Sequence, residues 1–269
     1  MIKFDYEIIA TGSSGNAVLI TCKPANKAQF KILFDMGISY KRLEKALSEA
    51  SFVFISHRHG DHINPSAYNK LTIEHPKTTI ISNQDVYEFT QEKGLSSPDI
   101  ILNEGMTGYL GDVKVTAFYN YHGVQCNGWI LELEGETLLY STDLSTTLEY
   151  SEYLRENKKQ VDYLLLEGNY DVNVYHYYVH LKVSSVEDLF NAGSARHLPI
   201  QEWESFKNEF THSESKIEML HTSSTYGTPE GLIITVNKER DKYNARNNAN
   251  VPHITLEQYY NWLNAKGGK

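Results

Sequence analysis

The sequence predicts an α/β fold in which two mixed β-sheets pack against each other and are flanked by helices. Short apolar segments with strand patterning alternate along the chain with segments whose apolar residues recur at helical spacing. This alternation is typical of sheets covered by helices. The chain has 269 residues, of which 41% are hydrophobic, so it can bury one large core. We therefore expect residues 1–269 to form a single domain.

The first half of the chain is expected to begin with three strands, because apolar residues alternate with polar ones between Gly-Ser and Pro-Ala-Asn turns. These strands cover Tyr6–Ile9, Ala17–Ile20 and Lys31–Phe34. Apolar residues at helical spacing then predict a helix over Arg42–Ala50. A short apolar strand at Ser51–Ser56 follows, and Asn64 with Pro65 opens a helix that runs through Leu71.

The second half of the chain continues the alternation. Strands are expected at Thr78–Ile81, Val113–Tyr119, Gly128–Glu134, Thr137–Ser141 and Tyr163–Leu166. Helices are expected at Gln84–Lys93, Ser184–Asn191, Ile200–Phe210, Pro229–Asn237 and Leu256–Ala265. Residues 238–250 are polar and rich in Asn, which predicts a mobile loop before the C-terminal helix. We expect the tail to provide the contacts of a homodimer.

The composition restricts the partners and the compartment of the chain. A net charge of −9 argues against broad binding to a phosphate backbone, although bound divalent ions would offset part of that charge locally. No run of 18 apolar residues is present and the N-terminus carries polar and acidic residues, so we expect a cytoplasmic protein without a membrane partner. Cys22 and Cys126 provide neither a disulfide framework nor a metal knuckle.

The strongest motif is H-R-H-G-D-H over residues 57–62, which follows the apolar strand at Ser51–Ser56. With 11 His in the chain, such a pattern arises by chance on the order of once in a thousand sequences, so the motif is informative. In an extended loop, His57 and His59 point the same way and can bind one ion, whereas Asp61 and His62 turn toward a second. Imidazole and carboxylate ligands suit zinc, manganese or iron better than calcium or magnesium.

This motif, with Gly12–Ala17 (GSSGNA) and Phe34–Ser39 (FDMGIS) in the same order, resembles the metallo-β-lactamase superfamily. Within it the motifs look like the YycJ/WalJ branch, a relative of the ribonuclease Z type phosphodiesterases. The resemblance covers roughly residues 5–235. It implies a four-layer αββα sandwich and a hydrolase with two divalent metal ions per chain, zinc or manganese, with iron as a further option.

The resemblance also implies three further metal ligands. His122 follows the strand Val113–Tyr119 and matches the third ligand of the first ion; a hydrogen-bonded structural His is the alternative. Asp143 follows the strand Thr137–Ser141 and matches the carboxylate that bridges both ions; an N-cap is the alternative. His221 matches the last ligand of the second ion, with a core or surface His as the alternative.

Two more residues bear on the reaction class. In ribonuclease Z type enzymes, the positions that match Glu167 and His197 form a pair beside the metals, in which the carboxylate orients an imidazole that can protonate the leaving oxygen. Here Arg196 and Pro199 replace the Gly and Ser that flank this His in the branch. A surface His at the flank of a helix is the alternative for His197.

These residues together predict hydrolysis of a phosphodiester. Two ions about 3.5–4 Å apart would hold a bridging water and ionise it, Asp61 would orient the resulting hydroxide, and His197 would protonate the departing alcohol. The resemblance implies a nuclease, exonuclease-like, that acts on DNA or RNA through this metal-bridging hydroxide. A nucleic acid or a nucleotide is therefore the expected substrate.

Three alternatives remain open at this stage. A cyclic-nucleotide phosphodiesterase fits because a small substrate tolerates an acidic surface. A metal-dependent hydrolase of esters, thioesters or lactams fits because the same ligand loop serves those reactions in the superfamily. A binding module that has lost turnover would keep the fold without catalysis.

Overall fold

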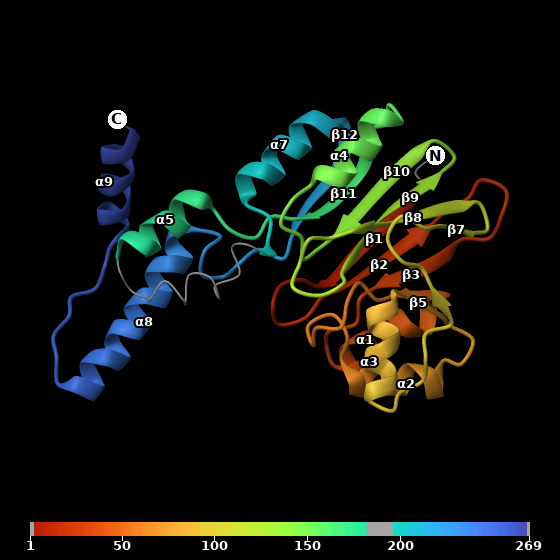
Figure 1. The fold of residues 1–269 in the computed structure, drawn as a ribbon, viewed down its shortest axis with the longest axis horizontal. Helices are drawn as coiled ribbons and strands as arrows, with labels where there is room; N and C mark the ends of the chain where they lie inside the picture. Colours follow the sequence, from red (N-terminus) through yellow and green to blue (C-terminus); the bar gives the residue numbers. More distant parts are fainter. Residues whose placement is uncertain (1–2, 182–195, 268–269) are drawn as a thin grey trace.

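A computed structural model describes residues 3–181 and 196–267 of the chain (Figure 1). The predicted fold class is confirmed: two mixed sheets of six strands each pack face to face, with helices outside them. The first sheet has the strand order β1-β2-β3-β4-β5-β6. Its strands are β1 (Phe4–Ala10), β2 (Ala17–Cys22), β3 (Phe30–Phe34), β4 (Phe52–Phe54), β5 (Thr79–Ser82) and β6 (Ile100–Ile101).

The second sheet has the strand order β12-β11-β10-β9-β8-β7. Its strands are β7 (Thr107–Leu110), β8 (Val113–Tyr119), β9 (Asn127–Leu133), β10 (Glu136–Ser141), β11 (Val161–Glu167) and β12 (Thr211–Leu220). In each sheet the strands change from antiparallel to parallel pairing: β3 runs parallel to β4, and β10 runs parallel to β11. Side chains at the carboxyl ends of these parallel strands therefore reach the same edge of the sandwich.

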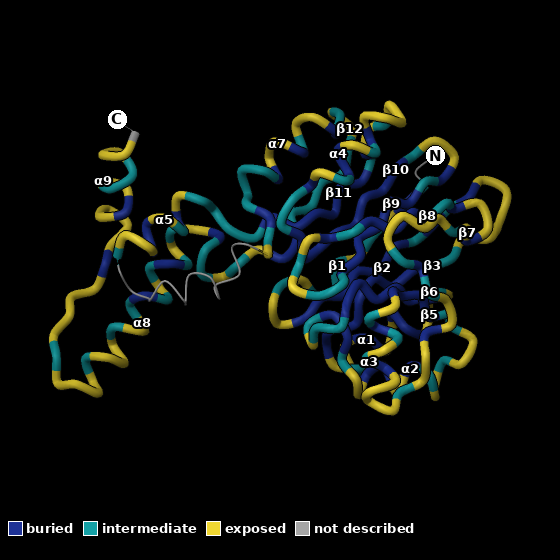
Figure 2. The backbone as a smooth tube through the Cα atoms, viewed as in Figure 1, coloured by how far each residue is buried: buried dark blue, intermediate teal, exposed yellow. Residues whose placement is uncertain are grey.

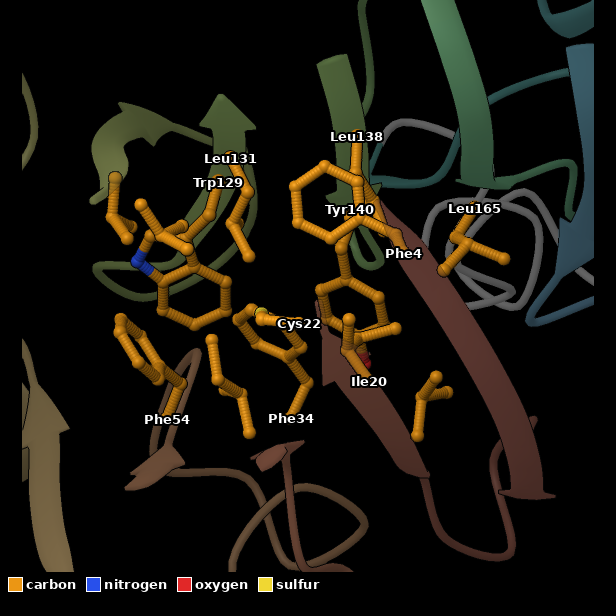
Figure 3. Close-up of a cluster of buried hydrophobic side chains, with 14 of the residues drawn as sticks. Phe4, Ile20, Cys22, Phe34, Phe54, Trp129, Leu131, Leu138, Tyr140 and Leu165 are labelled. Atoms are coloured by element: carbon orange, nitrogen blue, oxygen red, sulfur yellow. The ribbon is translucent and has the colours of Figure 1, made fainter. Parts of the chain in front are cut away.

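Aromatic side chains fill the space between the two sheets (Figure 3). Phe34 of the first sheet stacks on Tyr140 of the second, with ring centroids 4.6 Å apart. Trp129 lies 5.1 Å from the ring of Phe34 and contacts Phe54 edge to face at 5.4 Å. Because these rings are fully buried, they bind the sheets together and fix the edge where the strands end.

Helices cover the outer face of each sheet. The first sheet packs on α1 (Tyr40–Glu49), α2 (Pro65–Glu74) and α3 (Gln84–Glu92) through a second apolar cluster. The second sheet packs on α4 (Leu148–Glu156) and α7 (Ile200–Phe210) through a third. Figure 2 shows the buried parts of the chain concentrated in the two sheets, with exposed turns of helix outside them.

Three other helices form a lobe beside the sandwich: α5 (Val172–His180), α8 (Pro229–Asn247) and α9 (Leu256–Gly267) (Figure 1). They share a small apolar cluster that includes Tyr177, Leu232 and Tyr259. We propose that sandwich and lobe form the single predicted domain, because the lobe's helices follow β11 and β12 in the chain.

The prediction of a mobile loop over residues 238–250 is wrong, because α8 continues through Asn247. Asn244 in this segment and Asn237 just before it are hydrogen-bonded through their side chains. The side chains of Asn237 and Asn244 pair with backbone groups of Ile254 and Val251, where the chain returns along the helix. The helix ends at Asn248, whose φ of 49° is left-handed, a conformation that Asn tolerates.

Other elements were not predicted. The Val172–His180 segment is β-branched and aromatic, yet it is a helix, because Asp171 accepts hydrogen bonds from the first two free amides and the apolar side chains face the lobe. β6, β7, α4 and β12 also lacked a clear sequence pattern. The helix predicted at Ser184–Asn191 lies outside the described residues. Among the helices that the structure describes, none is both long and apolar enough to cross a membrane.

Candidate metal centre

The seven predicted metal ligands meet at one edge of the sandwich, where strands from both sheets end. The 57–62 loop follows β4, His122 follows β8, Asp143 follows β10 and His221 follows β12. Because these strands belong to two packed sheets, residues far apart in the chain converge on one centre. Glu167, the last residue of β11, ends at the same edge.

The first group of ligand atoms comes from three histidines. Nε2 of His57 lies 2.9 Å from Nδ1 of His59, and Nε2 of His122 lies 3.3 Å from the same Nδ1. Three imidazole nitrogens that face one point, with their rings edge to face, form a ligand set of the kind that binds zinc.

The second group comes from Asp61, His62 and His221. Oδ2 of Asp61 lies 3.6 Å from Nε2 of His62 and 3.5 Å from Nε2 of His221. Asp143 stands between the groups: its Oδ1 lies 3.6 Å from Nε2 of His122, and its Oδ2 lies 2.7 Å from Nε2 of His62. One carboxylate oxygen therefore faces each group of ligands.

The chemistry of these atoms fits metal cations. Oδ2 of Asp143 and Nε2 of His221 are buried and make no well-oriented hydrogen bond, because their near neighbours are other ligand atoms: Nε2 of His62 at 2.7 Å from the first and Oδ2 of Asp61 at 3.5 Å from the second. A buried polar atom that lacks a partner is destabilising unless an ion or a water satisfies it. The neighbouring ligand atoms lie within 4.8 Å of one another in groups of three or four, as a shared cation requires.

In three of the five ligand histidines, the opposite ring nitrogen contacts a hydrogen-bond acceptor. Nδ1 of His62 lies 2.9 Å from Oδ2 of Asp35, and Nδ1 of His122 lies 3.0 Å from the backbone oxygen of Arg196. Nδ1 of His221 lies 3.0 Å from Oε1 of Glu167. These acceptors fix the tautomer that leaves Nε2 free to bind a cation.

Asp35 is a site residue to which the sequence analysis assigned no role. It is fully buried, and it accepts hydrogen bonds from the backbone amide and hydroxyl of Ser56 at 2.8 Å and from the hydroxyl of Tyr140 at 3.0 Å. With these donors the carboxylate orients His62. The signal in the sequence was an acidic residue directly after the apolar strand that ends at Phe34.

Asn16 in the Gly-Ser loop was also missed. Its backbone amide and its side-chain Nδ2 both donate to the backbone oxygen of Asp61, at 2.7 and 3.2 Å, and Nδ2 lies 3.0 Å from Nε2 of His62. Gly37 completes this contact: a Cβ there would lie 1.7 Å from the oxygen of Asp61, so only glycine fits. The loop is thus in direct contact with the second ligand group.

Cys126 lies behind the first ligand group. Its Sγ is 3.5 Å from Nδ1 of His57, on the side of the ring that faces away from His59. Burial raises the pKa of this thiol well above its usual value, so it stays protonated. Cys22 is buried in the core between the sheets.

Glu167 links His197 to the ligand cluster. Its Oε1 lies 2.6 Å from Nδ1 of His197 and 3.0 Å from Nδ1 of His221, while Oε2 accepts the backbone amide of Leu144 at 2.9 Å. Burial acts to raise the pKa of Glu167, but the hydrogen bonds from His197 and His221 dominate and lower it. Nδ1 of His197 also lies 3.7 Å from Oδ1 of Asp143, so the predicted pair stands beside the cluster.

The histidines and carboxylates of the cluster shift one another's pKa values. Burial and the neighbouring His62 hold the pKa of His57 well below its usual value. For His62 burial also opposes the charged form, but the carboxylates of Asp143 and Asp35 outweigh it and raise the pKa. The pKa of Asp143 is well below its usual range, because His62 and His221 outweigh the effect of burial.

Two ligands sit on strained backbone. Asp143 has a φ of 57° and His221 a φ of 53°, in the left-handed region that residues other than glycine seldom adopt. Such strain persists where surrounding structure imposes it, and it clusters at functional sites. At both positions the turn brings a strand-end side chain into the cluster.

Residues 169–171 support the site from the lobe side. The side chain of Asn169 donates to the backbone oxygen of His221 at 2.7 Å. Asp171 caps α5. His176 and His180 are exposed on that helix, away from the ligand groups.

Comparisons with known proteins agree with this geometry. A family model described as the beta-lactamase superfamily domain matches residues 30–200. An exodeoxyribonuclease WalJ of Streptococcus pneumoniae is 26% identical over 186 residues, 64% of this chain and 65% of that protein. A UPF0173 metal-dependent hydrolase of Alkaliphilus metalliredigens is 24% identical over 139 residues, 48% of this chain and 60% of that protein. The alignments thus span less than two thirds of these curated relatives.

Solved structures share the fold at low identity. The metallo-β-lactamase fold protein YhfI of Bacillus subtilis aligns with a TM-score of 0.61 and 16% identity, over 87% of this chain and 92% of that one. The short form of human tRNase Z aligns with a TM-score of 0.58 and 14% identity, over 81% of this chain and 92% of that one. Because the family model covers more than half of the sequence, this chain belongs to the β-lactamase superfamily, and its clustered His and Asp residues are positioned to bind metal.

Proposed function

We propose that this protein is a metal-dependent phosphodiesterase with two cations per chain, and that it acts as a nuclease of the exonuclease-like type. The observation that carries the proposal is the Glu167–His197 pair, which places an oriented imidazole beside the ligand cluster. Hydrolysis of a phosphodiester needs a proton for the leaving oxygen, whereas the ligands alone supply none.

The two ligand groups support an assignment of the residues that would hold each cation. His57, His59 and His122 would hold one, Asp61, His62 and His221 would hold the other, and Asp143 would contact both. When bound, such a pair of ions supplies Lewis acidity toward phosphoryl oxygens and makes a water molecule acidic at neutral pH. Nitrogen and oxygen ligands favour zinc or manganese, with iron as a further option.

His197 would act as the general acid. Because Nδ1 donates to Glu167, Nε2 is the ring nitrogen that can carry a proton to the departing oxygen. The buried carboxylate of Glu167 stabilises the imidazolium and fixes the orientation of the ring, as a carboxylate behind a catalytic histidine does in hydrolases. The side chain of His197 is 16% exposed, so a substrate can reach it.

Asp61 would orient the attacking water. Its side chain is 24% exposed, the most open among the acidic groups of the cluster, and its oxygen faces both His62 and His221. The backbone of Asp61 is held by Asn16 and Gly37, so the carboxylate has a fixed direction.

The nuclease assignment draws support from the relatives. An exodeoxyribonuclease is among the matched sequences, and a tRNase Z is among the structures with the same fold. We propose a nucleic acid or a nucleotide as the substrate on this basis. A cytoplasmic location and a homodimer stay predictions from the sequence.

A cyclic-nucleotide phosphodiesterase is the second candidate. The net charge of −9 favours it, because a small substrate avoids the repulsion that a long phosphate backbone would meet on an acidic surface. Hydrolysis of esters, thioesters or lactams is less well supported, since the Glu167–His197 pair suits a poor alkoxide leaving group.

A panel of substrates tests the proposal. Protein loaded with manganese or zinc is incubated with linear DNA, RNA, cyclic mononucleotides, a lactone and a thioester. We expect cleavage of DNA or RNA, and its loss in Asp61→Ala. Activity confined to the lactone and the thioester would overturn the phosphodiesterase assignment, and activity confined to cyclic mononucleotides would replace the nuclease with the second candidate.

A further inference from the structure

Arg196 occupies a position between two elements of the candidate site. Its backbone oxygen accepts the Nδ1 proton of His122, at 3.0 Å, and the next residue in the chain is His197. This single backbone contact connects the first ligand group to the proposed general acid. The side chain of Arg196 therefore starts at the rim of the site, and its direction decides what else the rim can bind.

The guanidinium lies against the backbone of Gly123, which follows His122. A Cβ at Gly123 would be 3.3 Å from Nη1 and 3.4 Å from Cδ of Arg196. The absence of a side chain at Gly123 thus lets the arginine lie close to the backbone next to the ligand. A Cβ there would require the arginine side chain to shift by a few tenths of an ångström.

The charge of Arg196 has no partner among the described residues. In the described part of the chain, no carboxylate lies within salt-bridge distance of its side chain, and no acceptor lies within hydrogen-bond distance of the guanidinium. Other arginines differ: Arg58 pairs with Asp85 at 3.3 Å, and Arg155 makes a two-pronged pair with Glu209 at 2.7 and 2.9 Å. In a chain with a net charge of −9, an exposed and unpaired guanidinium at the rim of a site is available to an external anion.

We infer that Arg196 binds a phosphate next to the scissile one, and so selects substrates that carry at least two phosphates. The inference rests on the proposed function and names its substrate class more narrowly. The scissile group must reach the buried floor, where the side chain of His122 is only 3% exposed, whereas Arg196 is exposed at the rim. The planar guanidinium matches phosphate oxygens in two-pronged geometry.

A phosphate contact at Arg196 would distinguish a polynucleotide from a cyclic mononucleotide. A polynucleotide places a second phosphate outside the floor, where Arg196 can contact it. A cyclic mononucleotide has a single phosphate, which the floor occupies, so it gains nothing from the arginine. Arg196 would therefore offset, at one point, the repulsion between an acidic protein and a nucleic acid.

The test compares two substrates in steady-state kinetics with the manganese-loaded protein: a single-stranded oligodeoxynucleotide and bis(p-nitrophenyl) phosphate, a diester with one phosphate. For Arg196→Gln we expect kcat/KM for the oligonucleotide to fall about tenfold relative to kcat/KM for the small diester, mainly through KM. The slope of log(kcat/KM) against log salt should also become shallower by about 0.7, the value for one phosphate contact on a single strand.

Three further variants sharpen the result. Arg155→Gln removes the same charge at a site where the arginine is paired with Glu209, and should leave the ratio between the substrates unchanged. Arg196→Lys should recover part of the loss, because it keeps the charge without the two-pronged geometry. Gly123→Ala should change the ratio much less than Arg196→Gln does, because its Cβ would require the guanidinium to shift by only a few tenths of an ångström.

The outcomes distinguish a failure of the proposed role of Arg196 from a failure of the proposed phosphodiesterase activity. If Arg196→Gln and Arg155→Gln give the same ratio as the unchanged protein, while all of them cleave both substrates, the role of Arg196 is refuted and the phosphodiesterase proposal stands. If the unchanged protein cleaves neither substrate, the proposed function itself fails, and the inference about Arg196 fails with it.

Discussion

Oε1 of Glu167 lies 2.6 Å from Nδ1 of His197. The carboxylate is fully buried at the end of β11, and the imidazole is partly exposed beside the ligand cluster. A histidine held in this way by Nδ1 has Nε2 as its remaining ring nitrogen. Under the proposed function, this pair would supply the proton that the cations alone could not give to the leaving oxygen.

Replacement of His197 should therefore lower the rate of hydrolysis, and the loss should be larger for a leaving group that needs a proton. His197→Ala should lower kcat for a dinucleotide by about 10²–10⁴-fold, the usual contribution of a general acid. The loss should be much smaller for bis(p-nitrophenyl) phosphate, because p-nitrophenolate departs without a proton. Steady-state kinetics on both substrates measure this, and equal losses on both would contradict a general-acid role.

Glu167→Gln should show the same dependence on the leaving group in weaker form, because an amide holds the ring but does not stabilise the imidazolium. His221 shares the same carboxylate oxygen, so metal content must be measured alongside the rate. A variant that loses its metal while keeping the leaving-group dependence of the unchanged protein would show that Glu167 serves mainly His221.

Removal of the cations should destabilise the fold. Asp143 Oδ2 and His221 Nε2 are buried among other ligand atoms without a well-oriented hydrogen bond, and a bound ion would satisfy both. At a free metal concentration 100 times Kd, one bound ion stabilises the native state by about 2.7 kcal/mol. We expect a chelator to lower Tm by roughly 5–10 °C, measured by scanning calorimetry. In Asp143→Asn the chelator should have a smaller effect, and a Tm that does not respond to chelation in the unchanged protein would argue against the metal centre.

Asp35 should control the affinity for metal although it belongs to neither group of ligand atoms. It holds Nδ1 of His62 at 2.9 Å and is itself held by Ser56 and Tyr140. Asp35→Asn should weaken binding of the metal by about 10–100-fold, as loss of such a supporting carboxylate usually does. Competition with a metallochromic indicator measures the affinity. Asp162→Asn, which removes a carboxylate far along β11, is the matched control and should change little.

The ligand loop and most strands could be predicted from the sequence because their signals are local. Residues 57–62 place four ligands in six positions, and the strand Val113–Tyr119 is rich in apolar residues along its whole length. His221 was harder to place, because β12, which delivers it, is an edge strand with a largely polar sequence. Its register comes from pairing with β11 and not from its own pattern.

Contacts between distant loops could not be predicted at all. Asn16 reaches Asp61, 45 residues away, and Asp35 reaches His62, 27 residues away, so no spacing rule connects them. The helix over residues 238–247 was not predicted for a different reason. Their composition resembles a disordered segment, but Asn237 and Asn244 find partners only once the chain has folded back along α8.

Stability should depend on pH through Glu132, which lies on β9 away from the metal centre. Its Oε1 accepts hydrogen bonds from Lys114 at 3.0 Å and from Tyr153 at 2.5 Å, and its Oε2 pairs with Lys159. Burial acts to raise its pKa, but these donors outweigh it and lower the pKa from 4.5 to about 2.

Because the folded pKa is the lower one, Glu132 stabilises the protein fully above the unfolded pKa of 4.5, and this contribution disappears as the pH falls from there toward 2. Glu132→Gln should lower the free energy of unfolding by about 1–2 kcal/mol at pH 7. The difference from the unchanged protein should shrink steadily below pH 4.5. Urea unfolding at a series of pH values measures it, with Glu156→Gln on the exposed side of α4 as control. A difference that stays constant between pH 7 and pH 3 would mean that the loss arises from packing and not from the charge of Glu132.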